Sequence, residues 1–254
     1  MTSLSFLYKP LEQFEVNILV PIVFKIGDYF VDFSITNLSV FLLLGVLVFG
    51  LVWLILNQGK LIPFASQLVV ESLFSFVKGS MEQQVGRKGQ AYIPMVLTLF
   101  MFILVLNLLG MTPYAFAVTS QAVVNFTLSF AFFIAITIIG FLKQGAHYLM
   151  IFFPSGAPAA LMPLLVVIEI VSYFIKAFSL AIRLFANIMS GHTLLAILTS
   201  FVFDLGRSKF YLGLFPLVVI ILVSFLELAI AFLQAYVFFV LVLIYLKDAF
   251  ELSH

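Results

Sequence analysis

Long apolar runs separated by short polar stretches dominate this chain. Three of them, at about 38–57, 93–109 and 123–142, come close to the roughly 20 residues that an α-helix needs to cross a bilayer core about 30 Å thick. We therefore predict three conventional transmembrane helices within a single integral membrane domain, residues 1–254. Residues 1–36 are mixed and mildly acidic, which is typical of an N-terminal interfacial segment.

Two further apolar runs, at about 161–202 and 210–247, are twice as long. A helix of about 40 residues measures about 60 Å, so each must tilt steeply, lie partly along the membrane, or break. The charged stretch from Asp204 to Lys209 predicts a turn between them. We expect a long, steeply tilted antiparallel helix hairpin over 161–247 that carries the polar chemistry.

The stretch at about 62–85 has a different pattern. Polar residues recur every three or four positions, at Gln67, Glu71, Ser75, Lys78 and Glu82, with apolar residues between them. This spacing predicts an interfacial amphipathic helix. The pattern leaves open whether that helix lies on the membrane surface or packs on another subunit.

Composition agrees with an all-α membrane protein. The chain is 64% hydrophobic and 9% charged, whereas soluble domains have about 25% charged residues. It has no cysteine, a net charge of +1 and no basic cluster, so neither disulfide chemistry nor nucleic-acid binding is indicated. No metal-ligand cluster or phosphate-binding loop occurs, and we expect no metal, cofactor or catalytic site. Positive charges in the short loops place the N-terminus outside and the C-terminus inside.

Arg183 lies deep inside the run at 161–202. A guanidinium keeps its proton, and its charge at the bilayer centre costs about 2.5–3.5 kcal/mol on insertion scales. No acidic residue stands three or four positions away to pair with it. Snorkelling is a weak explanation, because about 20 residues separate Arg183 from each end of its segment. The charge must therefore be justified by something outside the local sequence.

A polar stripe surrounds Arg183. At 100° per residue, seven polar side chains share one sector of about 80° on this helix: Glu169, Ser172, Lys176, Ser179, Arg183, Asn187 and Ser190. Such a face indicates a water or ion path, or contact with a polar partner. Glu169 and Lys176 alternatively form a buried packing pair.

The last helix carries a second, sparser polar set. Glu227, Gln234 and Tyr245 lie on one side of it, and His192 lies on the far face of the preceding helix. One antiparallel register matches His192 with Glu227 and Arg183 with Gln234. Titratable groups then stand on both sides of a fixed positive charge, which suits two separated proton paths. The alternatives are a His192 hydrogen bond to a carbonyl and a Gln234 that only joins the helices.

The string from Ser179 to His192 resembles the signature of the ATP synthase subunit a family, the membrane stator subunits of F-type rotary ATP synthases. The strings Leu233–Phe238, with Tyr245 downstream, and Asn107–Tyr114 are also similar to that family. The resemblance covers about 38–250. Lys176 stands where related mitochondrial chains often have Arg. The positive charge is kept, but a lysine cannot form the two parallel hydrogen bonds that an arginine forms with a carboxylate.

The resemblance implies a role for each matching residue. Arg183 would be the essential arginine that faces the rotating c-ring, with Asn187 and Gln234 beside it. His192 and Glu227 would line the half-channel from the intermembrane space or periplasm, and Glu169 the half-channel to the matrix or cytoplasm. The remaining stripe residues and Tyr245 are expected to support this proton translocation: Lys176, Ser172, Ser179, Ser190 and Tyr245.

The resemblance also implies partners and a location. Expected partners are c-ring subunits, a b-type peripheral stalk, accessory membrane subunits, lipid and protons. Many bacterial members have the His and Glu positions exchanged, so this chain resembles the mitochondrial or alphaproteobacterial variant. We expect the mitochondrial inner membrane, with the bacterial plasma membrane as the alternative.

Two other classes fit less well. A self-contained proton channel or secondary transporter predicts inverted repeats in both halves, whereas the polar sites gather in the last 90 or so residues. An intramembrane protease needs a paired nucleophile and base, and the membrane serines have no placed partner.

Overall fold

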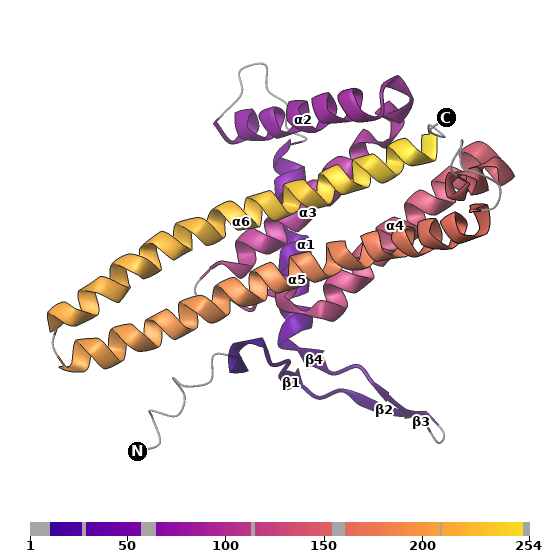
Figure 1. Ribbon diagram of the computed structural model, residues 1–254. Coiled ribbons are helices and arrows are strands. Elements are labelled where there is room, and N and C mark those ends of the chain that lie inside the picture. The colour runs from indigo at the N-terminus through magenta and orange to yellow at the C-terminus, as the bar shows by residue number, and fades with distance from the viewer. Residues whose placement is uncertain are drawn as a thin grey trace. The chain divides into compact units, whose positions relative to one another are not determined.

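The computed structural model describes residues 11–26, 29–56, 65–112, 115–153, 161–208 and 210–250. Among these residues, five helices are long and apolar enough to cross a membrane: α1 (Asn37–Leu56), α3 (Ile93–Gly110), α4 (Ala122–Gln144), α5 (Met162–Ser208) and α6 (Phe210–Phe250). The prediction of a helical protein with five long apolar helices is therefore confirmed (Figure 1).

The chain divides into two compact units by its own contacts. The first unit contains Met1–Gly50, Leu104–Gln121 and Leu184–Gln234, and the second contains Leu51–Ile103, Ala122–Arg183 and Ala235–His254. The division cuts α5 after Arg183 and α6 after Gln234, so each unit holds one part of both long helices.

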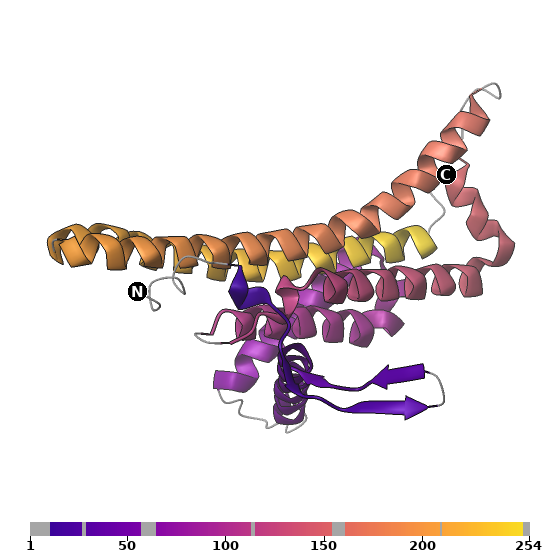
Figure 2. The same ribbon diagram turned by 90° about the horizontal axis from the view of Figure 1, so that it is seen from below.

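Short strands precede the first helix, a feature that the sequence pattern did not predict. β1 (Ile18–Val20) pairs antiparallel with β4 (Ile35–Thr36), and β2 (Val23–Ile26) pairs antiparallel with β3 (Tyr29–Asp32). Figure 2 shows the second pair as two long arrows. The strands are rich in β-branched and aromatic residues, which favour extended backbone. A short 3₁₀ helix, η2 (Glu12–Phe14), lies before them.

Within the first unit, α5 and α6 run antiparallel. Gly206 of α5 contacts Gly213 of α6, and Gly191, earlier in α5, contacts Glu227, later in α6. The two helices therefore run in opposite directions. The predicted turn from Asp204 is wrong, because α5 continues as helix to Ser208. Close contact between two glycines lets both helices extend this far, since no side chain separates their backbones. Lys209 lies outside the described residues.

Within the second unit, helix α2 (Ala65–Gln84) packs on α3 and α6. Its Val77 and Met81 are fully buried and, with Val85, recur every four residues along one face. Phe76 contacts the rings of Phe100 and Phe239 at centroid distances of 6.4 and 6.0 Å. The buried stripe of the amphipathic segment therefore contacts its own chain, whereas its other apolar side chains, such as Leu68 and Val69, stay exposed.

A tight turn ends α4 in the second unit. Gly145 adopts a φ of +60°, which favours glycine, and begins the 3₁₀ helix η5 (Gly145–Phe152). Tyr148 of η5 is 1% exposed because its ring packs directly on the backbone of Gly140, where any Cβ would clash with it. The pair fixes η5 against α4.

Candidate functional site

Arg183 lies on the exposed surface of α5. It makes no hydrogen bond or ion pair with any residue that the structure describes, although it is close enough to Tyr245 of α6 to interact with it electrostatically. Both residues belong to the second unit. An uncovered guanidinium within a 42-residue apolar span is costly unless another molecule faces it.

The rest of the stripe is similarly open. The side chains of Lys176, Ser179 and Ser190 are exposed, and those of Glu169, Ser172 and Asn187 are half-buried. The Ser190 hydroxyl donates to the Asn187 carbonyl at 3.1 Å. Most of the stripe is thus not covered by its own chain, which favours contact with a polar partner.

An amide pair joins α5 and α6 in the first unit. Asn187 Nδ2 donates to Gln234 Oε1 at 2.8 Å. Gln234 is only 3% exposed, and its own Nε2 has no hydrogen-bond partner among the described residues. The structure therefore brings two predicted site residues together and leaves one buried amide donor unused.

Asn107 of α3 holds α6 close to this pair. Its Nδ2 donates to the carbonyl of Ala231 at 3.2 Å, three residues before Gln234. Asn107 is fully buried, and its Oδ1 has no partner among the described residues. Asn107 contributed to the family resemblance of the sequence, but no role in the site was predicted for it.

Glu227 lies against Gly191, the residue before His192. A Cβ on Gly191 would meet the Glu227 carboxyl group, so only glycine allows this approach. Glu227 Oε1 is buried and without a hydrogen-bond partner among the described residues. The His192 ring packs edge-on against Phe14, with ring centroids 6.4 Å apart. The antiparallel register predicted that Glu227 faces His192, and in the structure Glu227 faces the neighbouring residue, Gly191.

A second polar group gathers in the second unit. Lys176 Nζ lies 5.9 Å from the centroid of the Tyr245 ring, a cation–π arrangement. Asp248 of α6 interacts electrostatically with Lys176, Lys247 and Glu169. Glu169 and Lys176 therefore share an electrostatic neighbour, Asp248, that the sequence did not predict, and Tyr245 contributes its ring to the same group.

Asp248 carried a sequence signal that was missed. It lies 14 residues after Gln234, which is two steps of seven and returns to within about 40° on an ideal helix. It therefore continues the face of Glu227 and Gln234.

A chain of hydroxyl groups lies beside this group. Tyr173 Oη is 2.9 Å from both Tyr148 Oη and Thr137 Oγ1, and Thr137 donates to the Phe133 carbonyl at 2.8 Å. Because Thr137 donates its proton to the carbonyl, Tyr173 must donate to Thr137, and Tyr148 to Tyr173. All three hydroxyl protons are therefore used in hydrogen bonds within the fold. Residues so far apart in sequence could not be grouped without the fold.

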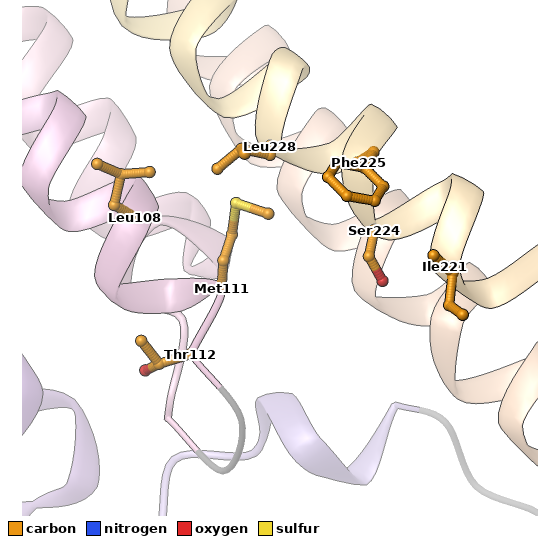
Figure 3. A pocket seen from close by; sticks show the side chains of 7 residues that line it. All are labelled: Leu108, Met111, Thr112, Ile221, Ser224, Phe225 and Leu228. Atoms are coloured by element: carbon orange, nitrogen blue, oxygen red, sulfur yellow. The ribbon is translucent and has the colours of Figure 1, made fainter.

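An apolar groove of about 440 Å³ lies in the first unit between the end of α3 and the middle of α6 (Figure 3). Its two hydroxyl groups are already bonded: Thr112, just after α3, donates to the Leu109 carbonyl at 2.7 Å, and Ser224 of α6 donates to the Ile220 carbonyl at 2.9 Å. No titratable side chain lines it: the lining residues are Leu108, Met111, Thr112, Ile221, Ser224, Phe225 and Leu228. The groove is therefore unsuited to carrying protons.

Five long apolar helices and an uncovered polar stripe define a multi-pass helical membrane protein. Within the described residues, no three His, Cys, Asp or Glu side chains form a group that could hold a metal ion.

Comparison with known proteins gives the family. The family model "ATP synthase A chain" matches residues 38–247. ATP synthase subunit a of Pelagibacter ubique is 43% identical over 249 residues, 96% of this chain and 98% of that protein. The Neurospora crassa protein is 43% identical over 263 residues (99% and 100%), and that of Brassica napus 42% over 254 residues (96% of each). The chain belongs to the ATP synthase A chain family, as the resemblance implied.

Proposed function

We propose that this chain is the proton-translocating stator subunit in the membrane sector of an F-type ATP synthase. The observation that carries the proposal is Arg183, an exposed guanidinium inside an apolar span with no hydrogen-bond or ion-pair partner among the described residues. Its counter-charge is a carboxylate on a rotating c-ring, and catalysis of ATP synthesis belongs to other subunits. Family membership supports this reading.

The guanidinium stabilises the ionised form of a ring carboxyl, which is unstable when it faces lipid. A ring carboxyl reaches the stator neutral, because an ionised carboxylate facing lipid is too costly. Beside Arg183 the carboxylate form is stabilised by attraction, and the proton leaves. A second proton then neutralises the site, which can rotate back into lipid. The fixed charge also repels protons and blocks a direct leak. Each charge that crosses 100 mV gains about 2.3 kcal/mol.

Two groups of residues serve the two sides of Arg183. His192 and Glu227, with the Asn187–Gln234 amide pair, form the path from the outer side. Glu169, with Lys176, Tyr245 and the newly found Asp248, forms the path to the inner side. The support is that each group is assembled inside its own unit, by contacts between α5 and α6. Ser172, Ser179 and Ser190 add hydroxyl groups along the exposed stripe.

The membrane arrangement follows from lengths and charges. Helices α5 and α6 have 47 and 41 residues, about 70 and 60 Å, so they cross the bilayer at a steep tilt as an antiparallel hairpin. Helices α1, α3 and α4 are conventional spans, α2 lies at the inner interface, and the N-terminus lies outside. The partners are a c-ring, a b-type peripheral stalk and accessory subunits. Relatives from a fungus, a plant and bacteria support a mitochondrial inner membrane or bacterial plasma membrane location.

Substitution of Arg183 tests the proposal. In the assembled complex, Arg183→Ala should abolish coupled ATP synthesis and ATP-driven proton pumping, because no charge remains to release the ring carboxyl's proton. Lys143→Ala, which removes an exposed cation at the end of α4, is the matched control and should leave both unchanged. Co-purification of c-ring and stalk subunits shows that assembly is intact. Wild-type synthesis by the R183A complex would contradict the proposal.

A further inference from the structure

The segment from Leu11 to Asn17 lies beside His192 in the first unit. The ring of Phe14 meets the imidazole in a T-shaped contact, with centroids 6.4 Å apart and an interplanar angle of 78°. Both rings are half-buried, so each shields the other from solvent. The sequence around Phe14 is otherwise polar, Glu12-Gln13-Phe14-Glu15, and one aromatic ring in such a stretch is not explained by a hydrophobic core.

Amide side chains from two helix starts hold this segment in place. Gln121, the residue before α4, donates from Nε2 to the Phe14 carbonyl at 2.7 Å. Asn37, the first residue of α1, donates from Nδ2 to the Glu15 carbonyl at 3.0 Å. Its Oδ1 accepts from the Asn17 backbone N–H at 3.1 Å, and its own N–H donates to the Asn17 carbonyl at 3.1 Å.

These hydrogen bonds fix the backbone at Phe14 and at the residues that follow it. A ring on a fixed backbone has few rotamers, so its position against the imidazole is determined by the fold. A phenyl ring neither donates nor accepts a conventional hydrogen bond, and it keeps water away from the part of the imidazole that it covers. Proton exchange with His192 is thereby limited to the remaining surface.

Acidic residues stand close to Phe14 in sequence and opposite Gly191. Glu12 and Glu15 flank Phe14 on its own segment, with side chains half-buried and exposed, and Glu227 faces the neighbouring Gly191 from α6. The α4 side contributes Gln121, which is neutral.

We infer that Leu11–Asn17 is the outer wall of the proton entry site, and that Phe14 is a positioning residue that orients the His192 imidazole. The inference rests on the proposed function, because it assumes that His192 passes protons. It adds a residue outside the two long helices, in a segment whose sequence predicted only an interfacial location.

The test is a double-mutant cycle on the purified complex in proteoliposomes, measuring proton flux and ATP synthesis. Phe14→Ala should lower proton flux about threefold, the scale of a direct contact between neighbouring side chains. Phe14→Tyr keeps the ring and should restore the flux. In a His192→Ala background, Phe14→Ala should have no further effect, because the imidazole that Phe14 positions is gone.

Two further variants separate this role from general disruption. Ile18→Ala removes an exposed side chain close to the same segment and should leave flux unchanged. Gln121→Leu keeps Phe14 but removes the donor to its carbonyl, and should lower flux in the same direction by a smaller factor. This variant also keeps the inference testable if F14A fails to assemble.

The outcomes distinguish the inference from the function on which it rests. Wild-type flux in F14A, or an F14A effect that is undiminished in the H192A background, overturns the positioning role alone. Wild-type flux in H192A removes His192 from the path and overturns both the outer half of the proposed path and the positioning role. Loss of coupling in R183A is independent of either result.

Discussion

The polar atoms of Gln234 and Glu227 in the first unit differ in their hydrogen bonding from the hydroxyls of Tyr148 and Tyr173 in the second unit. In the first unit, Gln234 Nε2 and Glu227 Oε1 are buried without hydrogen-bond partners among the described residues. In the second unit, the hydroxyls of Tyr148 and Tyr173 donate their protons along a chain that ends on a backbone carbonyl. Polar atoms buried without a hydrogen bond are costly, so each needs an explanation such as a functional role or a group that binds there. We therefore propose that Glu227 and its neighbours in the first unit exchange protons, whereas the hydroxyls of Tyr148 and Tyr173 in the second unit only hold the structure together.

That contrast predicts that exchange in the second unit depends on its carboxyl groups, Glu169 and Asp248, and not on the hydroxyls of Tyr148 and Tyr173. It also predicts that proton flux is sensitive to the approach of α5 to α6 in the first unit, where the position of Glu227 depends on the missing side chain of Gly191.

The largest expected effect beyond Arg183 is that of Gly191→Ala. The added Cβ would meet the Glu227 carboxyl group, so α6 or Glu227 must move. We expect a loss of proton flux of about tenfold or more, since overpacking a tight contact costs about 1–3 kcal/mol. Proton flux in proteoliposomes and the melting temperature of the complex measure it.

Gly79→Ala is the matched control for G191A. Gly79 lies within α2, and no described atom outside its own stretch of helix lies within 4 Å of the place that an added Cβ would take. Alanine is therefore accommodated there and favours the helix by about 0.5–1 kcal/mol. The G79A complex should melt no lower than wild type. Equal damage from both substitutions would remove the special role of the Gly191–Glu227 contact.

The smallest effects are expected in the hydroxyl chain, where the order of donation can be tested. Tyr173→Phe leaves the Tyr148 hydroxyl buried with its proton unsatisfied, whereas Tyr148→Phe only removes a donor. The first should therefore lower stability by about 1–3 kcal/mol and the second by about 0.5–1.5 kcal/mol. Thermal unfolding of the complex measures both.

Proton flux adds a second criterion to the tyrosine comparison. If the hydroxyl chain only stabilises the fold, proton flux per intact complex should stay near wild type in both variants. A large loss of flux in Tyr148→Phe with unchanged stability would mean that the hydroxyl chain conducts, and the contrast between the units would fail.

Much of the fold could be predicted because bilayer thickness and helix rise impose lengths on the sequence. The bounds of α1, α3 and α4 lie within two residues of the predicted spans. The strands of residues 18–36 were missed because each is only two to four residues long and shows no sustained alternation. The end of α5 was misplaced because charges near Asp204 suggest a turn, whereas the Gly206–Gly213 contact, which a sequence does not show, permits more helix.

The candidate site was predictable where its residues share a helix face. Helical spacing alone grouped Glu169, Lys176, Arg183 and Asn187, and the antiparallel register added Gln234. Partners contributed by other elements could not be found this way. Phe14 and Gln121 reach the His192 region from segments about 70 to 180 residues away in the chain, and only the fold brings them together.

Thiol accessibility tests directly whether the polar residues before and after Arg183 open to opposite sides of the membrane, as we propose. The chain has no cysteine, so single substitutions report one position each. Thr193→Cys, next to His192, and Ser172→Cys, between Glu169 and Lys176, are treated with a small membrane-impermeant thiol reagent from either side of sealed vesicles. We expect T193C to react only from the side that carries the N-terminus, and S172C only from the opposite side. Reaction of both variants from the same side would contradict it.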